Sequence, residues 1–576
     1  AFINQGTCLH GSAEGEVYKR LKYWIIMSGA CAACGQSTTH KCGGCNAVFY
    51  CSKEHQKKHW SIHKSKCPSY KIDSSAELGR FLIASRDIPS GDVVLMEAPL
   101  VVAPKQFTTP LCLSCYADID GSYRCSKCNW PLCSAECESK PAHAPECSLV
   151  QKGIGKVKFQ VYKGHDNPTY QSIAVMRCLS LRDTDKEGWE KLLSLESHDD
   201  KRKGTPKFQL DLMNISKFLR EYIQLDQFSE EQLMRMSGIL DVNSFEIPII
   251  KRGSADKEEE ESVMDTLRAI YPTGCLVEHS CLANSNVTFD DKYTLLLRAV
   301  RPIKKGEHLC LMYSDPLWCT HNRESHLSES KYFRCSCPRC VDPSELGTYL
   351  GGIRCPCEGV LVPQSPLKDD SVWKCEKCSL TKSAGEVTDL SNAIGKELIA
   401  TGKNVEDCEA FLQKNIKILH PHHQYIMDVK RALIQMYGRV PGKLNEDMSE
   451  EEMRKKELYC RDTLEVINKI LPGISKLKGL ILYELADVLL ALGKSLYEKQ
   501  KITRDKMQNY FQEIRDCLLE VQLHLKYSPP SLMEGHILAN AKQELEIIDM
   551  YIKSLSFEIK DGSVREHELE LLTLDD

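Results

Sequence analysis

The chain has 576 residues, of which 27% are charged and 42% hydrophobic, and 75 basic residues nearly balance 80 acidic ones. At roughly 150 residues per domain, this length allows three or four domains that each bury a core. The net charge of −5 excludes a general electrostatic attraction to nucleic acid or to an anionic membrane, so we expect no direct nucleic-acid binding. We find no run of about 18 apolar residues, the length a transmembrane helix requires, and we expect no membrane partner.

Cysteine is the unusual component of the composition. There are 29 cysteines, and most stand in pairs two or three residues apart. Disulfide frameworks are typical of small secreted domains, whereas this chain is large and shows no clear cleavable signal peptide. We therefore predict reduced, zinc-bound cysteines in the nucleus or the cytoplasm. Residues 1–26 carry no recognisable periodicity and are treated as an uncertain leader.

Two segments repeat one pattern of metal ligands: C-x2-C, C-x2-C, C-x3-[H/C] and H-x3-C. Each copy supplies eight ligands, enough for two tetrahedral zinc ions. An x2 spacing presents two thiolates from one tight turn, and an x3 spacing places two ligands on one face of a helix. The first module contains Cys31, Cys34, Cys42, Cys45, Cys51, His55, His63 and Cys67, and the second contains Cys112, Cys115, Cys125, Cys128, Cys133, Cys137, His143 and Cys147.

In modules this small we expect interleaved ligands, with the first pair joined to the third and the second pair joined to the fourth. The four predicted zinc sites are Cys31, Cys34, Cys51 and His55; Cys42, Cys45, His63 and Cys67; Cys112, Cys115, Cys133 and Cys137; and Cys125, Cys128, His143 and Cys147. His59 is an alternative to His55, because it lies on the same predicted short helix.

Two further clusters follow towards the C-terminus. Cys335, Cys337 and Cys340 are one ligand short, and Cys281 is the candidate to complete them; Cys355, Cys357, Cys375 and Cys378 resemble the two knuckles of a zinc ribbon. The four groups supply 24 ligands, which predicts about six zinc ions at four ligands each. Sites of four cysteine and histidine ligands leave no open position, so their zinc is structural.

Between the clusters, short segments rich in β-branched residues alternate with helical ones. Residues 78–101 predict two strands around a turn at Pro89 and Gly91. Residues 170–240 predict helices, and the charged run at 251–262 predicts a solvated loop.

The second half of the chain predicts strands first and then helices. Residues 286–300 predict a hairpin that turns at Asp290 and Asp291, and residues 301–313 a further strand pair with Gly306 at its turn. From about 386 to 557 apolar residues recur with a helical period.

A series of short motifs runs along the chain: GRF (79–81), a cysteine/histidine module, NSFEI (243–247), EHSCLAN (278–284), GEHLCLMY (306–313) and YFRCSCPRC (332–340). In this order they resemble the SET-domain protein lysine methyltransferases, in the subfamily that also carries MYND zinc fingers (the SMYD proteins). Two such fingers, one before the SET core and one inside it, resemble the arthropod-type branch. The resemblance implies an α+β multidomain fold: a β-rich SET core with inserted MYND zinc modules, a small zinc ribbon and an all-helical, TPR-like C-terminal domain.

Domain boundaries follow from these segments. We expect a leader (1–26), a first MYND-type finger (27–70), the N-terminal part of SET (71–110), a second MYND-type finger (111–148), a helical SET insert (149–237), the SET core (238–325), a post-SET zinc site (326–345), a zinc ribbon (346–385), a helical TPR-like domain (386–560) and an acidic tail (561–576).

The resemblance also implies a pocket for S-adenosylmethionine and a narrow channel for a target lysine. By position, the cofactor-binding residues are Gly79, Arg80, Asn243, Ser244, Glu278, His279, Tyr313 and Phe333. Tyr313 is the implied catalytic residue, Phe245 and Lys331 line the channel, and Cys281 aligns with the fourth ligand of the post-SET zinc site. The chain departs from the family pattern at Phe81 (a glycine in the family), Glu278 (asparagine), Ala283 (proline) and Lys331 (tyrosine).

Two functions remain open from the sequence. The first is an S-adenosylmethionine-dependent protein-lysine N-methyltransferase that acts on histone or non-histone protein. The second is a catalytically weak adaptor, whose fingers bind partner peptides or proteins and which regulates transcription or chromatin. In both cases we expect a monomer. Cofactor affinity separates the two, because an adaptor needs none.

Overall fold

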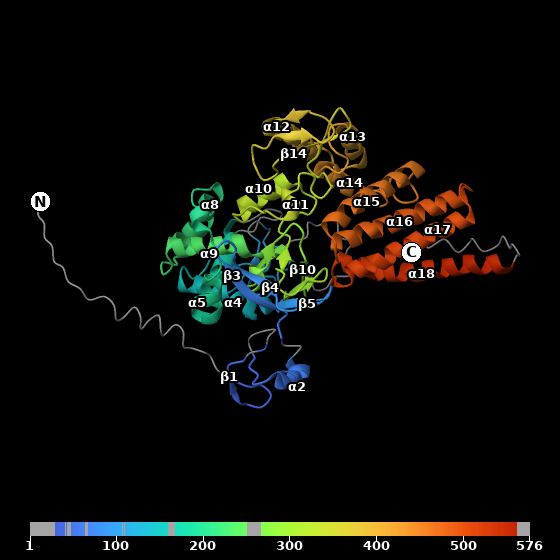
Figure 1. Cartoon of the computed structure of the whole chain (residues 1–576). Helices are drawn as coiled ribbons and strands as arrows, with labels where there is room; N and C mark the ends of the chain where they lie inside the picture. Colours follow the sequence, from blue (N-terminus) through green and yellow to red (C-terminus); the bar gives the residue numbers. More distant parts are fainter. Residues whose placement is uncertain are drawn as a thin grey trace, which may run out of the picture. The chain divides into compact units, whose positions relative to one another are not determined.

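The computed structural model describes residues 29–40, 42, 48–63, 67–105, 108, 110–158, 168–249 and 266–561, with side chains as far as residue 554 (Figure 1). The predicted leader (1–26), the predicted loop (251–262) and residues 562–576 of the predicted tail lie outside these residues. The chain divides into two compact units, Ala1–Ile88 with Ile303–His308, and Pro89–Pro302 with Leu309–Asp576.

The first unit holds the first cysteine module and a β-hairpin. Its elements are β1 (Gly29–Ala30), β2 (Ser37–Thr38), α2 (Lys53–His63), β3 (Tyr70–Ser75) and β4 (Gly79–Ala84). β3 and β4 pair antiparallel, and Gly79 begins β4 with φ +70°, a conformation that favours glycine. Residues 303–308 join β4 and its continuation through antiparallel bridges from Ile83 to His308 and from Ile88 to Ile303. These bridges explain why six residues distant in sequence belong to this unit.

Phe81 stands where the resembled family has a glycine, and its side chain contributes to packing in this unit. Its ring is buried and stacks on the ring of His308 with centroids 4.5 Å apart. No atom lies within 4 Å of the position that a Cβ on Gly79 would take. Within this unit, Phe81 therefore packs without crowding the backbone of Gly79.

Between Pro89 and Leu311, the described residues of the second unit form three small sheets. Their strands are β5 (Val93–Glu97), β6 (Val101–Pro104), β7 (Phe245–Pro248), β8 (Thr266–Ile270), β9 (Glu278–His279), β10 (Ser285–Phe289), β11 (Leu295–Ala299) and β12 (Cys310–Leu311). The sheet orders are β10-β11-β5, β6-β8-β7 and β12-β9, and only the last of these pairs is parallel. The predicted hairpin is confirmed: the Asp290 carboxylate accepts the backbone N–H groups of Lys292 and Thr294 and so closes the turn between β10 and β11.

Helices cover the second cysteine module and the β6-β8-β7 sheet. They are α3 (Ala135–Ser139), η2 (Pro141–His143), α4 (Ala144–Lys152), η3 (Pro168–Tyr170), α5 (Gln171–Thr184), α6 (Lys186–Leu193), α7 (Asp199–Arg202), α8 (Pro206–Asp211), the π-helix η4 (Leu212–Tyr222) and α9 (Glu230–Asn243). α5 is the central helix of this group, because it packs against α4, α6, α9, η4 and β6. α9 begins at a capping box of Ser229 and Gln232 and ends at Ser244, which fixes where Asn243 and Ser244 stand.

The remaining elements are three short helices, a four-stranded sheet and then a series of helices. They are η5 (Gly274–Leu276), α10 (Thr320–Ser330), α11 (Pro338–Val341), β13 (Ile353–Arg354), β14 (Val360–Pro363), β15 (Trp373–Cys375), β16 (Thr381–Lys382), α12 (Ala384–Ala400), α13 (Val405–Asn415), α14 (Gln424–Met436), α15 (Glu450–Ile470), α16 (Lys476–Glu498), α17 (Arg504–Leu525) and α18 (Met533–Asp561). β13 to β16 form one antiparallel sheet in chain order. The long helices lie side by side, with α16 between α15 and α17 and with α18 against α17 (Figure 1).

The predicted α+β multidomain class, with a helical C-terminal region, is confirmed. A TPR-like solenoid within that region stays a prediction. None of the helices in the described ranges has the length and apolarity required to cross a membrane.

Candidate functional site

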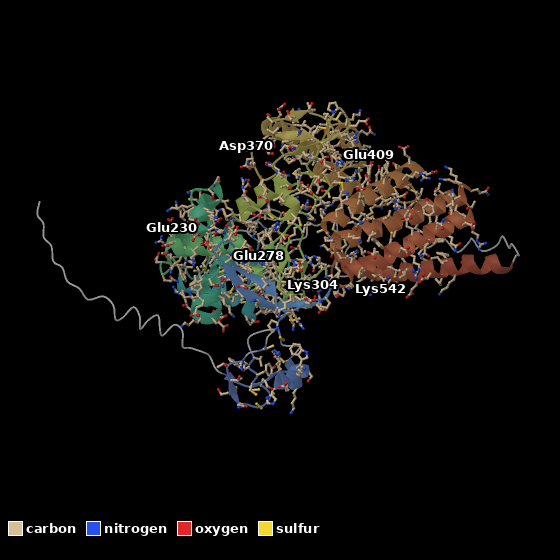
Figure 2. The ribbon with its side chains drawn as sticks, viewed as in Figure 1. Glu230, Glu278, Lys304, Asp370, Glu409 and Lys542 are labelled. Carbon is tan, nitrogen blue, oxygen red and sulfur yellow. The ribbon has the colours of Figure 1, made fainter. Side chains whose placement is uncertain are left out.

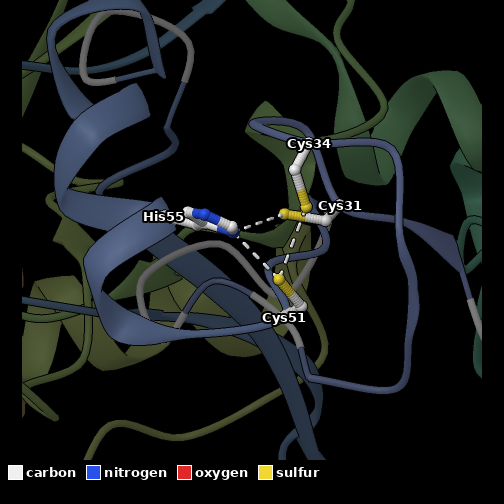
Figure 3. Close-up of side chains that lie close together, drawn as sticks. All are labelled: Cys31, Cys34, Cys51 and His55. Carbon is white, nitrogen blue, oxygen red and sulfur yellow. Dashed lines mark hydrogen bonds between the residues drawn. The ribbon is translucent and has the colours of Figure 1, made fainter.

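The first cysteine module brings together the ligands of its first predicted zinc site (Figure 3). His55 Nδ1 lies 2.9 Å from Cys51 Sγ and 3.8 Å from Cys31 Sγ, and Cys34 Sγ lies 3.6 Å from Cys51 Sγ. Zinc–sulfur bonds of about 2.3 Å in a tetrahedron place sulfur atoms about 3.8 Å apart, so this arrangement fits zinc. His59, the alternative ligand, is instead hydrogen-bonded through Nδ1 to the Tyr50 hydroxyl at 2.9 Å.

The second predicted site of this module is described in part. Cys42 Sγ and Cys67 Sγ are 3.8 Å apart, and the side chain of His63 is buried. Cys45 lies outside the described residues. The complete set of four ligands therefore stays a prediction.

The second module brings both of its predicted ligand sets together. In each set the four ligand atoms lie within 4.8 Å of one another. The sulfur atoms of Cys115 and Cys133 are 3.5 Å apart, and those of Cys125 and Cys147 are 3.8 Å apart. His143 presents Nε2 to its set, 3.3 Å from Cys128 Sγ. The interleaved arrangement expected from the spacing is the one the fold adopts.

A buried ion pair anchors the second module to α5. His143 Nδ1 donates to Glu146 Oε1 at 2.9 Å, and Glu146 accepts from Arg177 Nε at 2.9 Å and from Arg177 Nη2 at 2.8 Å. Arg177 also donates to the backbone carbonyls of Val102 and Leu113. Burial alone would raise the pKa of Glu146, but the Arg177 charge and the His143 hydrogen bond keep that pKa below its usual value. A carboxylate behind a zinc-binding histidine fixes the tautomer and orientation of the ring.

Cys281 lies with Cys335, Cys337 and Cys340, as the ligand count predicted. Its Sγ is 3.4 Å from Cys340 Sγ and 4.0 Å from Cys335 Sγ. Four thiolates around a zinc ion leave a net charge of −2, and Arg323 supplies a compensating cation. Its Nε lies 3.2 Å from Cys281 Sγ, its Nη2 lies 3.4 Å from Cys340 Sγ, and its Nη1 donates to Glu345 at 2.7 Å. The Arg323 side chain is fully buried.

We expect Arg323→Met to weaken zinc binding at this cluster about 10-fold to 100-fold, because charge-compensating hydrogen bonds to the thiolates are lost. The measurement is the zinc content of the purified chain after dialysis against a graded series of chelator concentrations. Arg334→Met is the matched control, since Arg334 is exposed and pairs with Asp369. Equal zinc retention by Arg323→Met and Arg334→Met would contradict this role.

The last cluster stands on the β13–β16 sheet. Cys355 Sγ is 3.4 Å from Cys357 Sγ and 3.6 Å from Cys378 Sγ, and Cys357 Sγ is 3.5 Å from Cys375 Sγ. These distances fit one tetrahedral zinc ion. The cluster packs against Ile353, Leu361 and Val387, so zinc there would fix a sheet that has a small apolar core.

His279 connects the Cys281 cluster to Tyr313. Its Nδ1 accepts from the Tyr313 backbone N–H at 3.0 Å, so the ring hydrogen resides on Nε2, which lies 3.3 Å from Cys281 Sγ. The rings of His279 and Tyr313 have centroids 5.2 Å apart. The Tyr313 hydroxyl donates to the Val277 carbonyl, and burial raises the pKa of Tyr313 well above its usual value. Both ring nitrogens of His279 are thus engaged within the protein.

Other predicted site residues gather around Tyr313 in the second unit. Lys331 Nζ lies 5.9 Å from the Tyr313 ring centroid, and the Phe333 ring lies 5.9 Å from the His279 ring. Glu278 is half-buried on β9 (Figure 2) and pairs through its backbone with β12.

The predicted second wall of the pocket lies where α9 ends. The Asn243 amide donates to the Glu196 and Ile239 carbonyls, and the Ser244 hydroxyl donates to the Leu240 carbonyl. Phe245 packs edge-on against Tyr271. Gly79 and Arg80 belong to the first unit, where they start β4.

Several residues of these sites were missed by the sequence analysis. They are Glu146, Arg177, Val277, Arg323 and Glu345. A signal existed for Glu146, which stands three residues after the predicted ligand His143. Arg177 and Arg323 lie on helices far from their partners in sequence, and no spacing rule selects them.

Comparison with known proteins identifies two domains. Residues 31–67 match the MYND finger and residues 79–314 match the SET domain. The chain carries the MYND finger and the SET domain that its motifs resemble. The family match names one MYND finger, and the assignment of the module at 112–147 as a second finger stays a prediction, as does the arthropod-type branch.

Relatives of this SET- and MYND-domain protein occur in animals and plants. It is 24% identical over 429 residues to the SET domain-containing protein SmydA-8, isoform A, of Drosophila melanogaster, covering 73% of this chain and 88% of that protein. Identity to the histone-lysine N-methyltransferase ASHR1 of Arabidopsis thaliana is 23% over 451 residues, covering 72% and 85%. Identity to the N-lysine methyltransferase SMYD2 of Mus musculus is 30% over 284 residues, covering 46% and 59%. A solved structure of Rubisco LSMT bound to AdoMet covers 90% of this chain and 98% of its own at 12% identity, with a TM-score of 0.26, which is too low for a comparison of sites.

Proposed function

We propose that this protein is an S-adenosylmethionine-dependent protein-lysine N-methyltransferase. The observation that carries the proposal is the SET match over residues 79–314, which includes Tyr313 with its backbone N–H and its hydroxyl both held by hydrogen bonds. Relatives named as histone-lysine N-methyltransferases and as an N-lysine methyltransferase support the same activity. They favour the enzyme over a cofactor-free adaptor.

The cofactor supplies an activated methyl group on a sulfonium, and the chain must align a lysine amine with it. Because the Tyr313 hydroxyl donates its hydrogen to the Val277 carbonyl, its lone pairs remain to accept from the target amine. Burial raises the pKa of Tyr313, so the phenol stays neutral and adds no charge near the sulfonium. A target lysine must lose a proton before it reacts, and an apolar channel favours that loss.

Of the predicted cofactor-binding residues, Phe333 fits the cofactor and Glu278 departs from the family pattern. Phe333 is 37% exposed beside the His279 ring and offers an aromatic face on which adenine can stack. Glu278 can accept a hydrogen bond from the cofactor's ammonium group. Its carboxylate also repels the cofactor's own carboxylate, whereas an asparagine amide would donate to it. We therefore propose that Glu278 lowers cofactor affinity without abolishing the site.

The remaining assignments are proposals that rest on the resemblance. They are about six structural zinc ions, protein substrates that include histones or non-histone proteins, peptide or protein partners of the MYND fingers, a monomeric state, and residence in the nucleus or the cytoplasm. The clustered thiols described above support the zinc sites individually.

The activity is tested by incubating the zinc-loaded full-length chain with methyl-labelled S-adenosylmethionine. The probes are core histones and a whole-cell extract that has been heated to inactivate other methyltransferases. We expect label on lysine side chains of at least one protein. Cofactor binding without any lysine labelling in either probe would contradict the proposal and favour the adaptor.

A further inference from the structure

Lys331 is held in a fixed position at the end of α10. Its backbone N–H donates to the Leu327 carbonyl, and its Nζ donates to the Val242 carbonyl at 2.6 Å. The same Nζ lies 5.9 Å from the centroid of the Tyr313 ring, within the range of a cation–π contact. A lysine amine therefore stands beside the residue proposed to receive the target amine.

The surroundings of this amine suit a nucleophile better than a surface cation. Its hydrogen bond goes to a backbone carbonyl, which accepts from an amine and from an ammonium alike. The nearby carboxylate of Asp241 is engaged by Arg202 at 2.8 Å and by Lys207 at 2.9 Å. Burial lowers the pKa of Lys331, and Asp241 and Cys275 oppose this shift only in part. The neutral amine is thus more accessible here than on an exposed lysine.

We propose that Lys331 is a site of self-methylation, in which this chain transfers the cofactor's methyl group to its own side chain. The inference rests on the proposed function, because the methyl donor is S-adenosylmethionine. In the step, the lone pair of Nζ forms a bond to the methyl carbon as the carbon–sulfur bond breaks. The sulfonium becomes the neutral thioether of S-adenosylhomocysteine, and the proton of the methylated ammonium leaves to solvent.

The hydrogen bond from Lys331 to Val242 limits how many methyl groups we expect on the Lys331 amine. A monomethylated amine keeps N–H groups that can again donate to the Val242 carbonyl, whereas a trimethylated one keeps none. The contact with the Tyr313 ring face tolerates methyl groups. We therefore expect mainly the monomethyl form, held in the position that Lys331 occupies now.

The test uses the full-length zinc-loaded chain and S-adenosylmethionine alone, so no foreign substrate is needed. The intact mass of the natural chain is measured before and after incubation, and the change is compared with that of the Tyr313→Phe variant. Peptide mapping then locates the modified residue. We expect one added methyl group on Lys331, present either as purified or after incubation. Lys331→Arg should lose this modification, while Lys201→Arg, whose Nζ contacts the neighbouring Tyr332 carbonyl, should retain it.

Two further readouts separate the possible failures. If methylation occurs within one chain, the fraction of chains methylated per unit time is independent of protein concentration. A methylated fraction that grows faster in proportion to protein concentration would overturn the intramolecular step. Calorimetric cofactor binding without methylation of Lys331 would overturn this inference and leave the proposed function standing. Absence of cofactor binding would overturn the proposed function, and the inference with it.

Discussion

Replacing Arg177 with methionine should lower the free energy of unfolding by about 3–5 kcal/mol, because it leaves a buried carboxylate without its cation. Glu146 is fully buried, and Arg177 supplies two of its hydrogen bonds in addition to the opposite charge. The loss should also loosen His143, whose ring orientation depends on Glu146. Urea unfolding of the zinc-loaded chain, followed by circular dichroism, measures the effect.

Lys152→Met is the matched control for this variant. Lys152 pairs with Asp183, which lies on the same helix as Arg177, but both side chains are about half exposed. Exposed pairs contribute about 0–1 kcal/mol, so this variant should unfold near the wild-type midpoint. Equal stability of Arg177→Met and Lys152→Met would show that the buried pair does not anchor the second module.

Replacing Tyr313 with phenylalanine should reduce kcat about 100-fold or more, since loss of a single positioning contact at the reacting atoms can cost that much. The ring can still pack beside His279, and the backbone N–H that reaches His279 Nδ1 is unchanged. Cofactor affinity and zinc content should therefore stay close to those of the wild type. Labelled methyl transfer to the best protein substrate, combined with calorimetry, measures both quantities.

Phe245→Leu serves for comparison, because it alters an aromatic contact with Tyr271 and removes no hydroxyl. Its kcat should change much less than that of Tyr313→Phe. If Tyr313→Phe keeps wild-type kcat while binding the cofactor normally, the hydroxyl has no role in transfer, and Tyr313 is only a packing residue.

The metal-ligand clusters could be predicted from sequence because their geometry is local. An x2 pair turns within one loop, and an x3 pair shares one helix face, so spacing alone pairs most ligands. Even the distant ligand Cys281 could be predicted, because Cys335, Cys337 and Cys340 supply only three of the four ligands that a zinc ion requires. The β10–β11 hairpin was equally local, since the side chain of Asp290 closes its own turn.

The contacts that support the sites could not be predicted in this way. Arg177 is 31 residues from Glu146, and Lys331 is 89 residues from Val242, so packing and not spacing brings them together. The two ring contacts of His279, with the Tyr313 backbone and with Cys281, could not be predicted either. A sequence motif identifies the histidine but not the partner of each ring nitrogen. Residues 303–308 belong to the first unit because of β-bridges to β4 and to Ile88. These bridges join residues that are distant in sequence, so no local sequence pattern predicts them.

Calorimetric titration of S-adenosylmethionine into the zinc-loaded chain and into Glu278→Asn tests the cofactor pocket most directly. We expect micromolar binding by the natural chain. We expect roughly tenfold tighter binding by Glu278→Asn, because one improved polar contact of about 1.4 kcal/mol changes the dissociation constant by that factor. Binding only by Glu278→Asn would mean that the natural SET core has lost its cofactor. No binding by either chain would contradict the pocket itself and the methyltransferase function with it.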